Sequence, residues 1–145
     1  MAALRVHNRS VRKPALFLLA LAATVLAQPS FLLPDDVTPK KHIIELTIDP
    51  AQDTFTGWSR IEVDLAKSTK TLWINAKDLT PQQSSVTYQG NTLQATATPT
   101  GGEFIAVELP QQIGPGPATI SIHYQGKLEG TAIAGPYRNK VANDW

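Results

Sequence analysis

The sequence contains no cysteine among its 145 residues. This absence excludes a disulfide framework, a thiolate zinc site, an iron–sulfur cluster and a cysteine nucleophile. No segment after residue 27 has apolar residues at helical spacing. The length indicates one domain and is too short for a large multidomain enzyme. Because 42% of the residues are hydrophobic, wholesale disorder is not expected.

From residue 28 onward the chain also has no excess of positive charge. Four of the 13 Lys and Arg residues lie within the first 13 positions. From residue 28 onward, nine basic residues remain against 12 Asp and Glu, a net charge of −3. The phosphate backbone of DNA or RNA repels such a surface, so we expect no nucleic-acid partner.

Residues 1–27 have the order of a secretory signal peptide. A basic, polar stretch over residues 1–13 precedes residues 15–27, which are apolar apart from Thr24. A helix of 13 residues spans roughly 20 Å, too short for a bilayer core of about 30 Å. Small residues follow, and we expect cleavage after Ala27. Without an Arg-Arg pair, the general secretory route is favoured, which places the product in the periplasm or outside the cell. An uncleaved amino-terminal anchor is the alternative.

The rest of the chain is patterned as β-strands. Three prolines make residues 28–41 an extended lead-in. Residues 55–65 show the clearest alternation, with Phe55 and Val63 on one face and Trp58 and Arg60 on the other. The glycine- and proline-rich residues 114–117 are not expected to be regular, and neither are residues 125–144. The expected strands are 43–48, 55–65, 71–75, 86–88, 93–97, 105–109 and 118–124.

Seven short strands joined by short turns predict an all-β, antiparallel β-sandwich or barrel. Connections this short favour antiparallel pairing over helical crossovers. We therefore expect a signal peptide over residues 1–27, the lead-in over 28–41 and a single β-sandwich domain over 42–145. The chain stops in an irregular stretch, so we expect this domain to be truncated at its carboxyl-terminal end.

Histidine and carboxylate chemistry is sparse. His42 and Glu45 are three apart, but on a strand such positions face opposite sides, so they do not form a zinc motif. We interpret His42 and His123 as polar residues on solvated strand faces. Glu62 and Asp64 share one face and could act as a carboxylate pair or bind a hard cation, but surface charges beside Arg60 are the simpler interpretation.

The serines and tryptophans do not identify a functional site either. Ser59, Ser84 and Ser85 have no G-x-S-x-G elbow and no convincing base. Trp58 and Trp73, both expected on outward faces, could stack on a sugar or pack under a neighbouring domain. We assign no catalytic, cofactor-binding or metal-binding residue, and no cofactor is expected in this chain.

A family resemblance is carried by the order of several short motifs. Phe55, Gly57, Ile61 and Val63 fit the pattern F-x-G-x-x-x-I-x-V, and Tyr124 and Gly126 fit Y-x-G. In this order the chain resembles the amino-terminal β-domain of the aminopeptidase N-like zinc metallopeptidases, the gluzincin aminopeptidases. The residues that carry the resemblance are 33–34, 38–39, 42–48, 55–63, 71–79, 109–110, 114–116, 120–126 and 135–139.

The resemblance implies a saddle-shaped β-sandwich that packs on a thermolysin-like catalytic domain. In the family, that second domain carries the H-E-x-x-H helix and binds the zinc. This sequence contains no H-E-x-x-H motif. The resemblance thus implies a secreted, non-catalytic domain, a fragment of a zinc aminopeptidase whose catalytic domain would be encoded downstream or separately. The alternative is a free-standing extracytoplasmic β-sandwich module that binds a sugar or a protein through Trp58 and Trp73.

Overall fold

The computed structural model describes residues 32–128 and Pro136. Every regular element in this part of the chain is a β-strand, as the period-two patterning predicts. The described residues include no helix long and apolar enough to span a bilayer. The strands are β1 (Val37–Thr47), β2 (Thr54–Leu65), β3 (Thr69–Asn75), β4 (Leu79–Tyr88), β5 (Asn91–Pro99), β6 (Phe104–Ile113) and β7 (Gly116–Lys127).

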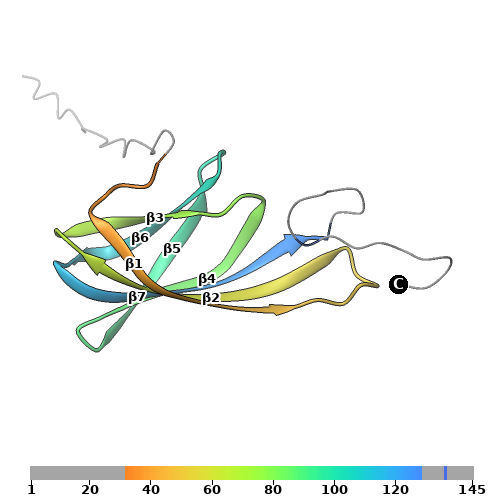
Figure 1. Ribbon diagram of the computed structural model, residues 1–145, viewed down its shortest axis with the longest axis horizontal. Helices are drawn as coiled ribbons and strands as arrows, with labels where there is room; N and C mark the ends of the chain where they lie inside the picture. Colours follow the sequence, from red (N-terminus) through yellow and green to blue (C-terminus); the bar gives the residue numbers. More distant parts are fainter. Residues whose placement is uncertain (1–31, 129–135, 137–145) are drawn as a thin grey trace, which may run out of the picture.

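The seven strands form one antiparallel sheet in the order β1-β2-β7-β4-β5-β6-β3, which curls back on itself. The turning point is β5: its first half pairs with β4, and its second half, from Thr96 to Pro99, pairs with β6. Figure 1 shows the result, with β3 and β6 lying across from β1, β2 and β7. The expected all-β, antiparallel, sandwich-like fold is confirmed.

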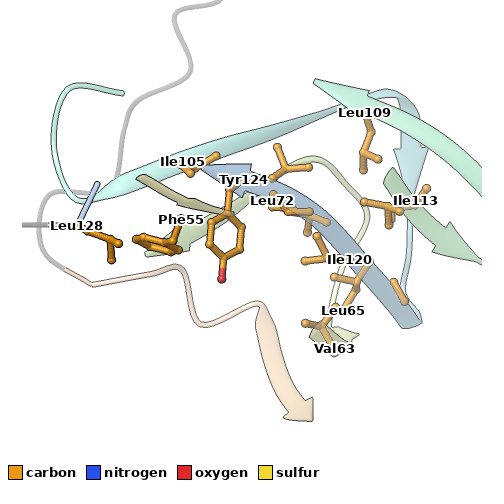
Figure 2. Packing of buried hydrophobic residues seen from close by; sticks show 14 residues of the cluster. Phe55, Val63, Leu65, Leu72, Ile105, Leu109, Ile113, Ile120, Tyr124 and Leu128 are labelled. Atoms are coloured by element: carbon orange, nitrogen blue, oxygen red, sulfur yellow. The ribbon is translucent and has the colours of Figure 1, made fainter. Parts of the chain in front are cut away.

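The hydrophobic core lies where the two halves of the curled sheet face each other (Figure 2). Leu72 of β3 and Val107 of β6 contribute from one half, and Val86 of β4 and Ile120 of β7 from the other; each is at most 2% exposed. The inward face predicted for residues 55–65 is correct, since Phe55, Val63 and Leu65 belong to this core. Fully burying such side chains contributes roughly 1.5–3 kcal/mol each.

Two aromatic rings lie directly over two glycines of the neighbouring strand. In the β2–β7 register Phe55 is opposite Gly126, and Gly57 is opposite Tyr124. A Cβ added at Gly57 would collide with the Tyr124 ring, and one at Gly126 with the Phe55 ring. The F-x-G and Y-x-G motifs therefore pack against each other: the aromatic ring of each motif lies on the glycine of the other, where no side chain is in the way.

Several strand boundaries differ from the sequence prediction. β1 begins at Val37, inside the expected lead-in, and β4 begins at Leu79, seven residues before its predicted start. The prolines that obscured both strands, Pro39 and Pro81, lie beside register shifts, where a strand can accommodate a residue without an N–H donor.

The carboxyl-terminal half contains two more corrections. Gly116 and Pro117 belong to β7, so the irregular break is confined to Gly114 and Pro115. β7 also continues to Lys127, beyond the predicted end at Tyr124, because Gly126 packs under Phe55 and keeps the ladder paired. The rest of the stretch expected to be irregular lies, apart from Leu128 and Pro136, outside the described residues, as does the expected signal peptide.

One end of the β1–β2–β7 layer extends beyond the other half of the sheet (Figure 1). Ile44 and Leu46 lie opposite Ser59 and Gly57 of β2, which places them on the inner face of the sheet. With Ile48 they nevertheless remain 53%, 46% and 47% exposed. We call Ile44, Leu46 and Ile48 the open inner face.

Candidate functional site

A hollow in the described residues lies between β1 and β3, the two edge strands of the curled sheet. It has a volume of about 570 Å³. β1 contributes Val37 and His42, β2 contributes Ile61, and β3 contributes Trp73 and Ile74. The hollow exists because β1 and β3 end the sheet and do not pair with each other.

A smaller cavity of about 190 Å³ continues the same groove toward the open inner face. The two cavities share His42, Ile61, Ile74 and Asn75, so we treat them as one feature, the edge groove. Its walls are mainly apolar, with the polar side chains of His42, Ser59 and Asn75 in the smaller cavity. A mainly apolar groove with a few polar groups has the chemistry of a surface that packs against another polypeptide or a ligand.

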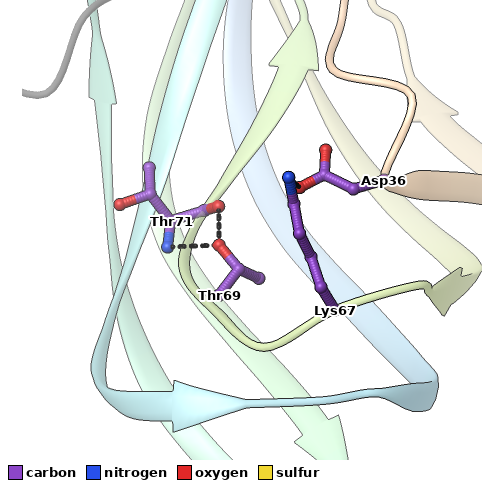
Figure 3. A network of polar contacts seen from close by, with 4 residues as sticks. All are labelled: Asp36, Lys67, Thr69 and Thr71. Atoms are coloured by element: carbon purple, nitrogen blue, oxygen red, sulfur yellow. Dashed lines mark hydrogen bonds and ion pairs between the residues drawn. The ribbon is translucent and has the colours of Figure 1, made fainter.

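One end of the edge groove is fastened by polar contacts (Figure 3). The Lys67 ammonium lies 3.2 Å from the Asp36 carboxylate, and the Ala66 N–H donates to the Asp36 carbonyl at 2.8 Å. At the start of β3, the Thr69 hydroxyl donates to the Thr71 carbonyl at 2.7 Å and accepts the Thr71 N–H at 3.1 Å. The two Asp36 contacts hold the segment before β1 against the β2–β3 turn, and the two Thr69 contacts fix the start of β3.

His42 lies on the inner face of the sheet and contacts Ser59. Its Nε2 is 3.3 Å from the Ser59 hydroxyl oxygen, and the Ser59 side chain is buried while His42 is exposed. Sequence reasoning found no base for Ser59, and the structure places the His42 ring beside its hydroxyl. The sequence did contain a signal for this contact. His42 alternates with Ile44 on one strand and Ser59 with Ile61 on the next, so both polar residues fall on the inner face. The contact gives the buried hydroxyl a partner and ties β1 to β2, which is a structural role.

The two described histidines lie on opposite faces of the sheet. His123 is opposite Trp58 on the outer face, with the ring centroids 6.3 Å apart, whereas His42 is opposite Ile61 on the inner face. One metal ion could not bind both. Across residues 32–128 and Pro136, no three His, Asp or Glu side chains are grouped so that they could hold a metal.

The carboxylate pair and the serines have structural surroundings. Asp64 lies 3.1 Å from the Lys40 ammonium, and both side chains are about half exposed. Glu62 is opposite Lys41 on the outer face. The buried Ser84 hydroxyl donates to the Ala95 carbonyl at 2.7 Å, while Ser85 is half-buried in the β4–β7 pairing.

The two tryptophans do not form the joint outer patch that sequence reasoning considered. β2 and β3 are not neighbours in the sheet, so Trp58 and Trp73 are separated. The Trp58 ring lies beside His123 on the outer face, tilted by 45° to it, and Trp73 lines the edge groove. The exposed apolar surface is instead the open inner face. The alternation of Ile44, Leu46 and Ile48 was visible in the sequence, but nothing in it indicated that the opposite half of the sheet stops short.

Comparison with known families settles what this fold is. The model of the Peptidase M1 N-terminal domain matches residues 38–144. The chain belongs to this family. The resemblance that the F-x-G and Y-x-G motifs indicated is therefore confirmed.

Curated relatives include two rice proteins. Aminopeptidase M1-D and Aminopeptidase M1-C of Oryza sativa subsp. japonica are each 26% identical to the chain over 108 residues. The match covers 74% of this chain but only 12% of either aminopeptidase. The chain therefore corresponds to a small part of these relatives.

Solved structures share the fold. A two-domain M1 zinc metallopeptidase variant bound to L-tryptophan superimposes with a TM-score of 0.54 at 16% identity, over 72% of this chain and 23% of that chain. An M1 zinc metallopeptidase from Deinococcus radiodurans gives a TM-score of 0.52 at 16% identity, over 69% and 22%. At this identity the likeness concerns the fold of the M1 N-terminal domain.

Proposed function

We propose that this M1 N-terminal domain is a secreted, non-catalytic part of a zinc aminopeptidase and that it supplies a docking surface to a catalytic domain. The single observation that carries the proposal is family membership over residues 38–144 combined with an apolar face left open at the inner side of the sheet. The curated relatives are named aminopeptidases, and the chain matches only 12% of their length.

The distribution of polar residues supports a scaffold role. Zinc peptidase chemistry needs three protein ligands around one open position and a positioned general base. Here His42 and His123 lie on opposite faces, Asp64 is paired with Lys40, and Ser84 is hydrogen-bonded to the backbone. Zinc would then be held by the catalytic domain, with no ligand from this domain.

The surface that would meet the catalytic domain is the open inner face together with the edge groove. Single exposed apolar residues are ordinary. Ile44 and Leu46 on the inner face of β1 and Ile48 just after it are exposed together, which marks a contact surface. Trp73 extends this apolar character into the groove. Covering these side chains removes apolar area from water at about 25 cal/mol per Å² before ordering costs.

The first experiment is to read the coding sequence that follows residue 145. An in-frame or adjacent H-E-x-x-H with a distal Glu is expected. If no such coding sequence follows, the free-standing binding module becomes the better interpretation, and the tryptophan fluorescence of the chain should then respond to an added sugar or peptide.

The second experiment tests docking. The catalytic polypeptide is expressed with the chain, and co-purification is measured. The Ile44→Ser, Leu46→Ser double variant should lose co-purification. Leu32→Ser, which changes an 84% exposed leucine that precedes β1, should retain it. Equal retention by both variants would place the contact elsewhere.

The chain alone should not release amino-terminal residues from aminoacyl substrates, with or without added zinc. Zinc-dependent activity abolished by either His42→Ala or His123→Ala would contradict the proposal. Export is tested separately: mass spectrometry of the extracytoplasmic fraction should find a mature chain that begins at Gln28, and recovery of intact residues 1–13 on a cytoplasmic protein would contradict secretion.

A further inference from the structure

β1 has a free backbone edge. Within residues 32–128 it pairs with β2 only, so the other side of the strand presents unpaired N–H and C=O groups. Free edges of this kind pair with other strands unless charge, proline or a bulge prevents it. The two halves of β1 differ in this respect.

The first half of β1 is protected and the second half is not. Pro39, Lys40 and Lys41 surround a register shift, which combines the three common forms of edge protection. From His42 to Thr47 the register with β2 is continuous, and Glu45 is the only acidic or basic side chain apart from His42 itself. This second half is therefore able to accept another strand.

We propose that the second half of β1 pairs antiparallel with β1 of a second copy of this chain, with Ile43 at the two-fold axis. In this register, Lys41 lies opposite Glu45 of the partner subunit, and Glu45 lies opposite Lys41 of the partner subunit. All three residues are on the outer face, since their partners in the β1–β2 register are Glu62, Arg60 and Trp58. The strand is thus complementary to itself in charge.

Neighbouring registers lack this complementarity. Residues that pair across two antiparallel strands point to the same face of the sheet. If both inner faces are to lie on the same side, the two-fold axis must therefore lie midway between the two copies of one residue, which pairs with itself. An axis at Glu45 would set two carboxylates against each other, which is destabilising. An axis at Ile44 would leave no opposite charges facing. Among the charged residues within β1, only the axis at Ile43 brings two opposite charge pairs together.

The inner face also gains from this register. Ile44 would lie beside His42 of the partner subunit and diagonally next to Ile44 of the partner subunit, within reach of aliphatic side chains. Part of the exposed area of Ile44 would then be covered, whereas Leu46 and Ile48 stay available. The pairing uses the backbone edge of β1, so it does not depend on the docking role proposed above.

The expected dimer is weak and depends on concentration, because one strand pair buries less than a standard interface of about 1,600 Å². Sedimentation velocity of the purified chain over a concentration series should show a monomer–dimer equilibrium. Dimerisation should weaken as salt is added, because exposed charge pairs are screened.

A charge-swap experiment tests the register. Lys41→Glu places two carboxylates at each charge pair, and Glu45→Lys places two ammonium groups there. Each variant alone should dimerise at least about tenfold more weakly than the parent chain. An equimolar mixture of the two variants should form a heterodimer, because both charge pairs become opposite again. Lys127→Glu, the same charge change at an exposed site on β7, should dimerise like the parent.

Glu62 lies opposite Lys41 on β2, so Lys41→Glu is expected to lower the stability of the monomer slightly. The thermal unfolding of each variant is therefore recorded beside its sedimentation. Recovery of dimer in the mixture shows that both variants are folded. A parent chain that stays monomeric at every concentration, single variants that dimerise like the parent, or a mixture that does not associate would each overturn the proposal.

Discussion

The two ends of the β1–β2–β7 layer achieve burial in different ways. At the covered end, β3 and β6 lie across from the layer, and Leu72 and Val107 are buried between the halves of the sheet. At the projecting end, Ile44, Leu46 and Ile48 stay exposed, while Phe55 and Tyr124, which lie on Gly126 and Gly57 of their own layer, are buried in the core cluster. Alternation therefore determines which face of the sheet a side chain occupies. Whether the side chain is buried depends on what packs on that face, either an opposing layer or residues of a neighbouring strand.

The largest effect is expected from truncating a leucine at the covered end. Leu72→Ala should destabilise the domain by about 2–5 kcal/mol, because a fully buried side chain leaves a cavity. Leu46→Ala, the same change on the open inner face, should cost less than about 1 kcal/mol. Urea unfolding followed by fluorescence measures both. Similar losses for the two variants would mean that the ends do not differ in burial.

The glycine–aromatic pairs should give the next largest effect. Gly57→Ala forces the Tyr124 ring off the sheet, and Gly126→Ala displaces the Phe55 ring. Each should cost about 1–3 kcal/mol, as overpacking does.

A double-mutant cycle separates this mechanism from a general intolerance of alanine. In a Tyr124→Ala background, Gly57→Ala should cost clearly less, since no ring remains to be displaced. An unchanged cost there would show that the ring contact is not what restricts residue 57 to glycine.

Much of this fold could be predicted from the sequence, because each strand alternates with a period of two and short turns separate the strands. Residues 55–65 needed no tertiary information. The start of β4 could not be found, because Pro81 argues against a strand and its tolerance depends on a bulge beside β7. Strand order could not be found either, since β7 pairs between β2 and β4, far from it in sequence.

The edge groove depends on tertiary structure in the same way. It arises where β1 and β3 happen to end the curled sheet, and the contact between His42 and Ser59 joins residues 17 positions apart. The inward alternation of both residues was available as a signal. Their closeness required the β1–β2 register, which the sequence does not specify.

A smaller effect is expected from the buried serine of β4, Ser84. Ser84→Ala removes the donor to the Ala95 carbonyl and should cost about 1 kcal/mol, the usual net value of such a hydrogen bond. Ser85→Ala, a half-buried neighbour on the same strand, serves as the matched control and should change less. Chemical denaturation compares them, and an equal shift in both would assign the effect to strand propensity.

The smallest effect on stability per substituted residue, together with a large effect on association, is expected at the projecting end. The Ile44→Ser, Leu46→Ser, Ile48→Ser triple variant removes apolar side chains that are already about half in water, so the free energy of unfolding should fall by no more than about 1–2 kcal/mol in total. Binding of a hydrophobic dye and losses by precipitation should both decrease, because the exposed apolar patch is gone. A Trp58→Ser, Trp73→Ser variant is the comparison, since it changes larger residues that do not form a shared patch. If the tryptophan variant lowers dye binding while the triple variant does not, the exposed apolar surface of this domain lies elsewhere than on the inner face of β1.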